Sequence, residues 1–211
     1  MSVFSDVDYQ NRKTSPCVIY GQKWNNFKKM SMQPMQSKWA ARFIWAAVIQ
    51  GLIATIATIL VLDPIQYLTG KTDYFSAARV IAGGGGGVWF FTGYISFLVV
   101  GVVATAVTAI FYFYIESSMG KVYSGITNYL AWGHLVFMNL GVTVSMSLMM
   151  YQGYLAGWAS APVASGGLGT PEIVHPEILG WTSNYIGGFI LLAAIGALLG
   201  GLGYILRSRM K

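Results

Sequence analysis

Very few side chains in this sequence could carry chemistry, and His134 is the first of them. It lies in the run Ala131-Trp-Gly-His134-Leu-Val-Phe-Met-Asn139, which contains no Asp, Glu, Lys or Arg. An imidazole in an apolar segment could ligate haem or copper, or bind a quinone head group. A histidine that hydrogen-bonds a neighbouring helix is the alternative, and it is favoured because no second ligand stands at a metal-binding spacing. We expect Asn139 to bond across helices.

A second candidate site is the run Glu172-Ile-Val-His175-Pro-Glu177. Two carboxylates beside an imidazole form a possible metal-ligand set, so His175, Glu172 and Glu177 are candidate metal ligands. Pro171 and Pro176 favour a different interpretation, a rigid turn, because each proline fixes its own φ.

Sulfur chemistry has little support. The single cysteine, Cys17, has no partner for an intrachain disulfide and no neighbouring ligand for zinc. Four methionines with soft thioether sulfurs could bind copper(I), but their apolar context favours packing instead; they are Met138, Met146, Met149 and Met150.

The elements that must position these residues are membrane helices. Of 211 residues, 55% are hydrophobic and 9% are charged, against roughly 25% charged in a soluble domain. Four stretches without charge are long enough to span a bilayer, which takes about 20 residues; they are residues 43–62, 88–115, 129–151 and 185–206. The predicted fold is an all-α integral membrane protein with four transmembrane helices in residues 38–211, after a polar N-terminal arm in residues 1–37. An ion pump is disfavoured, because pumps normally require ionisable residues inside the membrane, and these four stretches contain no Asp, Glu, Lys or Arg.

Basic residues predict the orientation. Eleven Lys and Arg fall in the segments before the first span, between the second and third, and after the fourth, whereas only Lys71 and Arg79 fall on the other side. The positive-inside rule then places both termini in the cytoplasm, for a multi-pass protein of the plasma membrane. The basic residues flank apolar spans, so a nucleic-acid partner is not expected.

Glycines predict how these helices pack. Small residues recur at four-residue spacing in the third and fourth spans, at Gly153 and Gly157 and at Gly196 and Gly200. Such spacing allows helices to approach closely in lipid, and it favours a subunit of a complex. The pentaglycine run at residues 83–87 is expected to be a loop or swivel before the second span.

The last three spans resemble the last three transmembrane helices of subunit I of the haem-copper oxidases. The resemblance covers about 120 residues. It rests on the run Gly101-Val-Val-Ala104-Thr-Ala-Val-Thr-Ala109, on His134 with Gly141 seven residues later, and on Trp181-Thr-Ser-Asn-Tyr-Ile-Gly187-Gly188-Phe189-Ile190.

The departures from that family bear on function. The resemblance puts the family's two haem-ligand histidines near Gly93 and Ile95, which cannot ligate, and replaces its Pro-Arg-Arg with the region of Trp158-Ala-Ser-Ala. The family histidine that matches His134 is not a haem ligand. The resemblance therefore implies a chain that has lost the redox site, with haem or copper in partner subunits.

Three functional hypotheses follow. The first is a non-catalytic accessory subunit of a respiratory terminal oxidase, or of a similar membrane oxidoreductase complex from a prokaryote, in contact with the lipid bilayer and with other membrane subunits. The second is a small quinone- or haem-binding electron-transfer subunit that uses His134. The third is an accessory subunit of a copper membrane monooxygenase, to which only the His175 segment could contribute ligands.

Overall fold

A computed structural model describes residues 37–62, 68, 77–82 and 85–210 of the chain. Every regular element in these residues is helical, and four helical segments are long and apolar enough to cross a membrane. The first is α2 (Lys38–Leu62) and the fourth is α9 (Ser183–Arg209). The four predicted membrane helices of an all-α fold are thus confirmed. The predicted N-terminal arm, with Cys17, lies outside the described residues, apart from Ser37.

The second and third spans are each built from several consecutive helical segments. The second consists of α5 (Gly87–Ser96), η1 (Phe97–Val103), α6 (Ala104–Phe113) and η2 (Tyr114–Ser118). The third consists of α7 (Ile126–Gly133), η3 (His134–Met138) and α8 (Asn139–Ser160). The segments η1, η2 and η3 are π-helical, and such wide turns occur frequently at functional sites.

Shorter helices lie in two of the connections. The connection from α2 to the second span contains α4 (Ala77–Ala82), and the connection before α9 contains η4 (Val163–Ser165), η5 (Pro171–Ile173) and η6 (Val174–Leu179). None of these was expected, because each is shorter than the window in which a hydrophobic period can be recognised.

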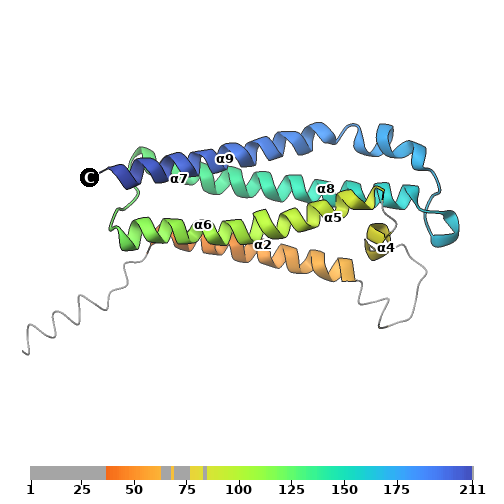
Figure 1. Cartoon of the computed structure of the whole chain (residues 1–211), viewed down its shortest axis with the longest axis horizontal. Helices are drawn as coiled ribbons and strands as arrows, with labels where there is room; N and C mark the ends of the chain where they lie inside the picture. Colours follow the sequence, from red (N-terminus) through yellow and green to blue (C-terminus); the bar gives the residue numbers. More distant parts are fainter. Residues whose placement is uncertain (1–36, 63–67, 69–76, 83–84, 211) are drawn as a thin grey trace, which may run out of the picture. The chain divides into compact units, whose positions relative to one another are not determined.

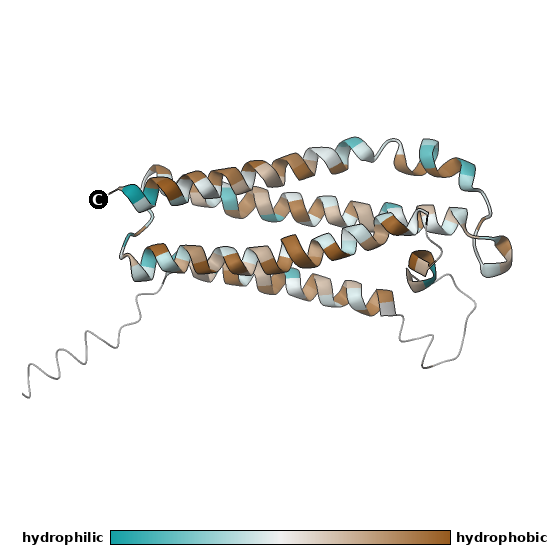
Figure 2. Ribbon diagram, in the orientation of Figure 1, coloured by the Kyte–Doolittle hydropathy of each residue, from teal (hydrophilic) through white to brown (hydrophobic). Residues whose placement is uncertain are grey.

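Neighbouring spans pack side by side in chain order. In Figure 1, α2 lies along α6, α5 lies along α8, and α7 and α8 lie along α9. The long helices are largely apolar along their length in Figure 2, and large side chains such as Trp45, Leu60 and Leu198 are exposed. Helices that are apolar on their outer faces match a hydrocarbon surrounding, so the chain is a multi-pass membrane protein.

Glycines bring α5 and α8 into direct backbone contact. A Cβ built on Gly153 would overlap the backbone of Phe90, and one built on Gly93 would lie 2.9 Å from the carbonyl oxygen of Met146. A Cβ on Gly157 would overlap the side chain of Val80. Gly153 and Gly157 therefore lie at helix contacts, as does Gly196, where a Cβ would overlap the backbone of Met138.

The described part of the pentaglycine run is closely packed. Gly85 has a φ of 55°, in the left-handed region that favours glycine. A Cβ on Gly86 would lie 2.7 Å from the backbone nitrogen of Gly157, and one on Gly87 would overlap the carbonyl of Val80. From Gly85 onward the run forms a tight turn and the start of α5, in which Gly85 supplies the positive φ and Gly86 and Gly87 allow close contact.

Candidate functional site

His134 lies in the π-helical turn η3 and is only 7% exposed. Its Nδ1 lies 3.2 Å from the hydroxyl of Tyr112, and its Nε2 lies 3.2 Å from the sulfur of Met138. A thioether sulfur can only accept a hydrogen bond, so this pair of contacts assigns the proton to Nε2 and makes Tyr112 the donor to Nδ1. Both ring nitrogens thus have partners within the protein, which favours a structural role for His134 over ligation.

Aromatic rings from α2 and from the connection after η2 pack against this pair. Phe43 stacks on Tyr112 with ring centroids 4.8 Å apart, and its ring lies 5.0 Å from that of His134. The ring centroid of Tyr123, from the connection after η2, lies 5.0 Å from that of Tyr112. Rings at these separations stabilise one another beyond the area that they bury, by about 0.5–1.5 kcal/mol per pair. The surroundings therefore hold the imidazole and the phenol in fixed positions.

On the side of α9 the same pair borders a cavity of about 360 Å³. The lining combines aromatic walls with hydroxyl groups and one imidazole, and consists of Thr108, Phe111, Tyr112, Tyr123, His134, Gly200, Gly201, Tyr204 and Ile205. Mostly apolar walls with a few convergent polar groups are typical of small-molecule sites. The arrangement can accept an aromatic head group and can offer it hydrogen bonds, without a charged side chain in the lining.

Glu116 is a buried charged residue that the sequence prediction missed. The second span was expected to end at residue 115, but its helix continues to Ser118, and Glu116 is 6% exposed. Ser37 Oγ donates a hydrogen bond of 2.5 Å to Glu116 Oε2, and the backbone N–H of Trp39 donates another of 3.1 Å. The predicted span of residues 88–115 itself holds no charge, but the helix extends beyond it, and in this extension the Glu116 carboxylate caps α2.

The reason why Glu116 is tolerated is the free N–H groups at the start of α2. Ser37 precedes the helix, and its hydroxyl also accepts a 3.1 Å hydrogen bond from the backbone N–H of Ala40. The first N–H groups of a helix have no partner within the helix and carry partial positive charge. A carboxylate from the neighbouring span satisfies them and is itself stabilised. A serine just before an apolar run is the signal that could have located this cap.

Cationic side chains lie at the same end of the helices as Glu116. The Arg42 guanidinium lies 4.4 Å from the ring centroid of Trp39 and 4.8 Å from that of Trp132. Lys121 Nζ donates a 2.6 Å hydrogen bond to the carbonyl oxygen of Ser208, near the end of α9. Cation–π contacts and the capping of a helix C-terminus both favour positive charge at these positions.

Asn139 connects three spans, which confirms the predicted interhelical bond. Its Oδ1 accepts a 2.5 Å hydrogen bond from Gln50 Nε2 of α2 and a 3.3 Å bond from Thr105 Oγ1 of α6. Its Nδ2 donates to the carbonyl oxygen of Leu135 at 2.6 Å. Gly101 makes room for this network, because a Cβ there would lie 2.6 Å from Gln50 Oε1.

The positions near which the resemblance places haem ligands lie on α5, one packed against α8 and one exposed. Gly93 is buried at the contact described above, 2.9 Å from Met146 when a Cβ is added, whereas Ile95 is 39% exposed. Neither residue offers a ligand atom, and the backbones of the two helices leave no space for a macrocycle beside Gly93. The residues present at this level do not fit a haem.

The candidate metal ligands near the start of α9 lie in η5 and η6. Glu172, His175 and Glu177 are all exposed. In the described part of the chain, no three His, Cys, Asp or Glu side chains are grouped closely enough to hold a metal ion. Pro171 occupies the first position of η5, in keeping with the predicted rigid turn.

Comparison with known proteins adds no relative. No protein-family model, no curated protein and no solved structure matches the chain.

Proposed function

We propose that this chain is an integral-membrane accessory subunit of a respiratory terminal oxidase or a similar membrane oxidoreductase complex, with haem or copper held by partner subunits. The observation that carries the proposal is the α5–α8 contact, where Gly93, near the position that the resemblance gives to a haem ligand, would lie within 3 Å of α8 if it had a Cβ. In this proposal the contact serves packing and assembly, and it offers no haem ligand.

The proposal includes an orientation in the plasma membrane, with both termini in the cytoplasm. Its support is the excess of Lys and Arg, including Lys38, Arg42 and Lys121, on the side of the two termini. A cysteine placed between Pro162 and Pro171, after replacement of Cys17, should react with a membrane-impermeant maleimide added to intact cells. Labelling only after cell lysis would contradict this orientation.

Co-purification tests the accessory role. The tagged chain, extracted from its native membrane in a mild detergent, should migrate with larger subunits that show the Soret absorbance of haem. The chain purified alone should show no Soret band. Migration of the native chain as a monomer, or a Soret band that stays with the isolated chain, would overturn the proposal.

A quinone-type site at His134 is the second candidate, and the cavity of about 360 Å³ beside the His134–Tyr112 pair is the observation that favours it. A reduced quinone ring could stack on the aromatic walls and donate a hydrogen bond to the hydroxyl oxygen of Tyr112, whose own proton is held by His134 Nδ1. The variant Gly201→Phe tests this, because no described atom lies within 4 Å of a Cβ built on Gly201, so the ring can fill the cavity. Gly188, which faces open space elsewhere on α9, provides the matched control Gly188→Phe.

The quinone hypothesis makes a clear demand on turnover. In the assembled complex, Gly201→Phe and His134→Ala should each abolish quinol-dependent electron transfer, while Gly188→Phe should leave it unchanged. Unaltered turnover in the first two variants would eliminate the second candidate and leave the accessory role as proposed.

A further inference from the structure

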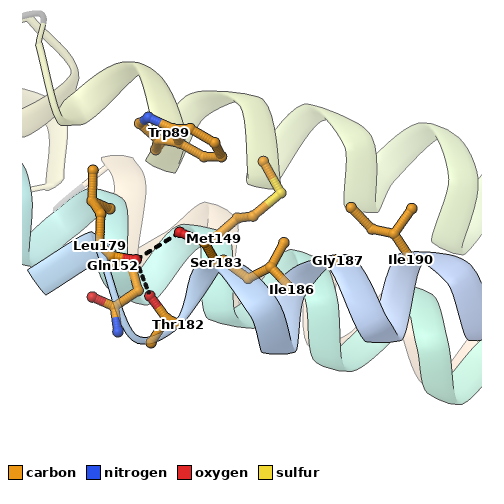
Figure 3. Close-up of a pocket in the computed structure, with 9 residues that line it drawn as sticks. All are labelled: Trp89, Met149, Gln152, Leu179, Thr182, Ser183, Ile186, Gly187 and Ile190. Atoms are coloured by element: carbon orange, nitrogen blue, oxygen red, sulfur yellow. Dashed lines mark hydrogen bonds between the residues drawn. The ribbon is translucent and has the colours of Figure 1, made fainter. Parts of the chain in front are cut away.

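A second cavity, of about 220 Å³, lies between α5, α8 and the first turns of α9. It is separate from the cavity at His134 and shares no lining residue with it. Figure 3 shows that Gln152, Leu179 and Thr182 lie at one end of it and Ile190 at the other, with Trp89 on the facing helix. The lining residues are Trp89, Met149, Gln152, Leu179, Thr182, Ser183, Ile186, Gly187 and Ile190.

Three side-chain oxygens in the lining of this cavity, those of Gln152, Thr182 and Ser183, can still accept a hydrogen bond. Gln152 is only 2% exposed, and its Oε1 finds no hydrogen-bond partner among the described residues. Ser183 Oγ already donates to the carbonyl oxygen of Leu179 at 2.7 Å, and Thr182 Oγ1 donates to the carbonyl oxygens of Ile178 and Leu179 at 3.3 and 3.2 Å. Each hydroxyl has a single proton, so only lone pairs remain on both oxygens.

The buried amide oxygen of Gln152 requires a hydrogen-bond donor. Leaving a buried acceptor without a hydrogen bond costs about 1–3 kcal/mol. A molecule that presents hydroxyl groups could donate to Gln152 Oε1 and to the lone pairs of Thr182 and Ser183, whereas one that presents only carbonyl oxygens could not.

The volume of the cavity and its lining side chains further restrict the kind of molecule that can bind. The volume of about 220 Å³ is several times that of one water and exceeds the ~150 Å³ of an engineered cavity that binds benzene. Trp89 offers an aromatic face, and Met149 offers an adaptable thioether, which makes favourable contacts with rings. A single six-membered ring with hydroxyl substituents matches this space.

The location favours a molecule that resides in the membrane. Trp89 is the third residue of the second span, and Ser183 is the first residue of α9, so the cavity begins where two apolar helices begin. Ile190, seven residues further along α9 and about 10 Å deeper, is exposed at the other end of the cavity. A polar head at the Gln152 end would therefore have an apolar tail that leaves along Ile190 into lipid.

We propose that this cavity binds the hydroxyl-bearing six-membered ring of a membrane amphiphile, with a ring hydroxyl donating a hydrogen bond to Gln152 Oε1. Two sources share this chemistry, the hydroquinone ring of a reduced quinone and the sugar ring of a glycolipid. The proposal does not depend on the accessory role proposed above, because it concerns only residues of this chain.

Binding to the full chain in phosphatidylcholine nanodiscs tests the proposal, since this lipid has no head-group hydroxyl to compete. The probes are a short-chain ubiquinol kept reduced, the same compound oxidised, and an alkyl glucoside, each titrated with detection by native mass spectrometry. We expect the wild-type chain to bind the quinol or the glucoside, and to bind the oxidised quinone at least tenfold more weakly. Quinol binding alone identifies a quinol source, and glucoside binding alone identifies a glycolipid source.

Two substitutions assign the binding to this cavity. In Gly187→Phe the new side chain starts in open space beside the cavity, since no described atom lies within 4 Å of a Cβ there, and should reduce the affinity at least tenfold. Gly188→Phe is the matched control, because Gly188 is equally open but does not line the cavity, and should bind as the wild type does. Gln152→Leu removes the acceptor at similar volume and should also lose at least fivefold.

Three results would overturn the proposal. The first is a wild-type chain that binds neither hydroxylated probe, which would mean that water or lipid tails fill the cavity. The second is equal affinity in Gly187→Phe and the wild type, and the third is equal affinity in Gln152→Leu and the wild type. If Gln152→Leu does not fold, as judged by its circular dichroism, the comparison of Gly187→Phe with Gly188→Phe decides the question by itself.

Discussion

The imidazole of His134 lies directly against Gly200 of α9, so closely that a Cβ on Gly200 would overlap Nδ1 of the ring. The same nitrogen accepts the hydrogen bond of Tyr112. A glycine at this position thus lets α9 approach η3 while the imidazole keeps its partner. Position 200 cannot accept a larger residue without moving either the helix or the ring.

Gly200→Ala is therefore expected to destabilise the protein. The added methyl group must displace the His134 ring or separate α9 from η3, and overpacking of this kind costs about 1–3 kcal/mol. The adjacent Gly201→Ala is the control, because no described atom lies within 4 Å of a Cβ there. In thermal unfolding in detergent, Gly200→Ala should lower Tm, and Gly201→Ala should leave it unchanged or raise it. Equal Tm values for the two variants would contradict the contact.

Glu116→Ala is expected to weaken the anchoring of α2 to the second span. The substitution removes the acceptor of both Ser37 Oγ and the Trp39 N–H, and a buried donor left unpaired costs about 1–3 kcal/mol. Glu116→Gln keeps an oxygen acceptor without the charge, so its Tm should fall between those of Glu116→Ala and the wild type.

A double-mutant cycle separates this contact from unrelated effects. Ser37→Ala alone should cost about 1 kcal/mol, the usual cost of losing a helix N-cap. Because Ser37 and Glu116 share a hydrogen bond, the loss in the double variant should be smaller than the sum of the two single losses. Strict additivity would show that the two residues act independently.

The four membrane helices could be predicted from the sequence because hydrocarbon allows few alternatives to a long apolar helix. Their ends could not, since a helix can continue past the polar or charged residue that bounds an apolar stretch. The third helix continues beyond residue 151 through Gly153 and Gly157, whose missing side chains bring α5 and α4 close to it. The buried position of Glu116 could not be predicted either, because its hydrogen-bond partner, Ser37, lies 79 residues earlier in the chain.

The cavities could not be predicted either, and α9 shows why. It has six glycines on a helix that is apolar all round, so no hydrophobic period shows which face each glycine takes. In the structure Gly196 and Gly200 contact the third span, whereas Gly187 and Gly201 border open space in two different cavities. That difference depends on where the neighbouring helices lie, and the residues around each glycine do not encode their positions.

Gly153→Ala is expected to disrupt the α5–α8 contact. A Cβ there would overlap the backbone of Phe90, which cannot move away as a flexible side chain could. The expected loss is about 1–3 kcal/mol, seen as a lower Tm and as faster proteolysis in the connection between α8 and α9, which lies at the same end of the helices as Gly153. Gly51→Ala in α2 is the control, since its nearest neighbour would lie 4.0 Å away. A Gly153→Ala variant as stable as Gly51→Ala would refute the contact.

Tyr123 gives the protein a pH-dependent stability in the alkaline range. Burial, with a smaller effect of the nearby Glu116 carboxylate, raises the pKa of Tyr123 above its usual value of 10.0. The folded protein then keeps the phenol protonated while the unfolded chain ionises near pH 10, so the stabilisation is complete below pH 10 and is lost as the pH rises beyond it, by up to about 1.4 kcal/mol per pH unit. Above pH 10 the Tm of the wild type should fall more steeply than that of Tyr123→Phe, which has no phenol to ionise.

Tyrosinate absorbance gives an internal control: at pH 11 the two folded proteins should have equal absorbance, and after unfolding they should differ by one tyrosinate. A difference of one tyrosinate already present in the folded state would show that Tyr123 is not protected.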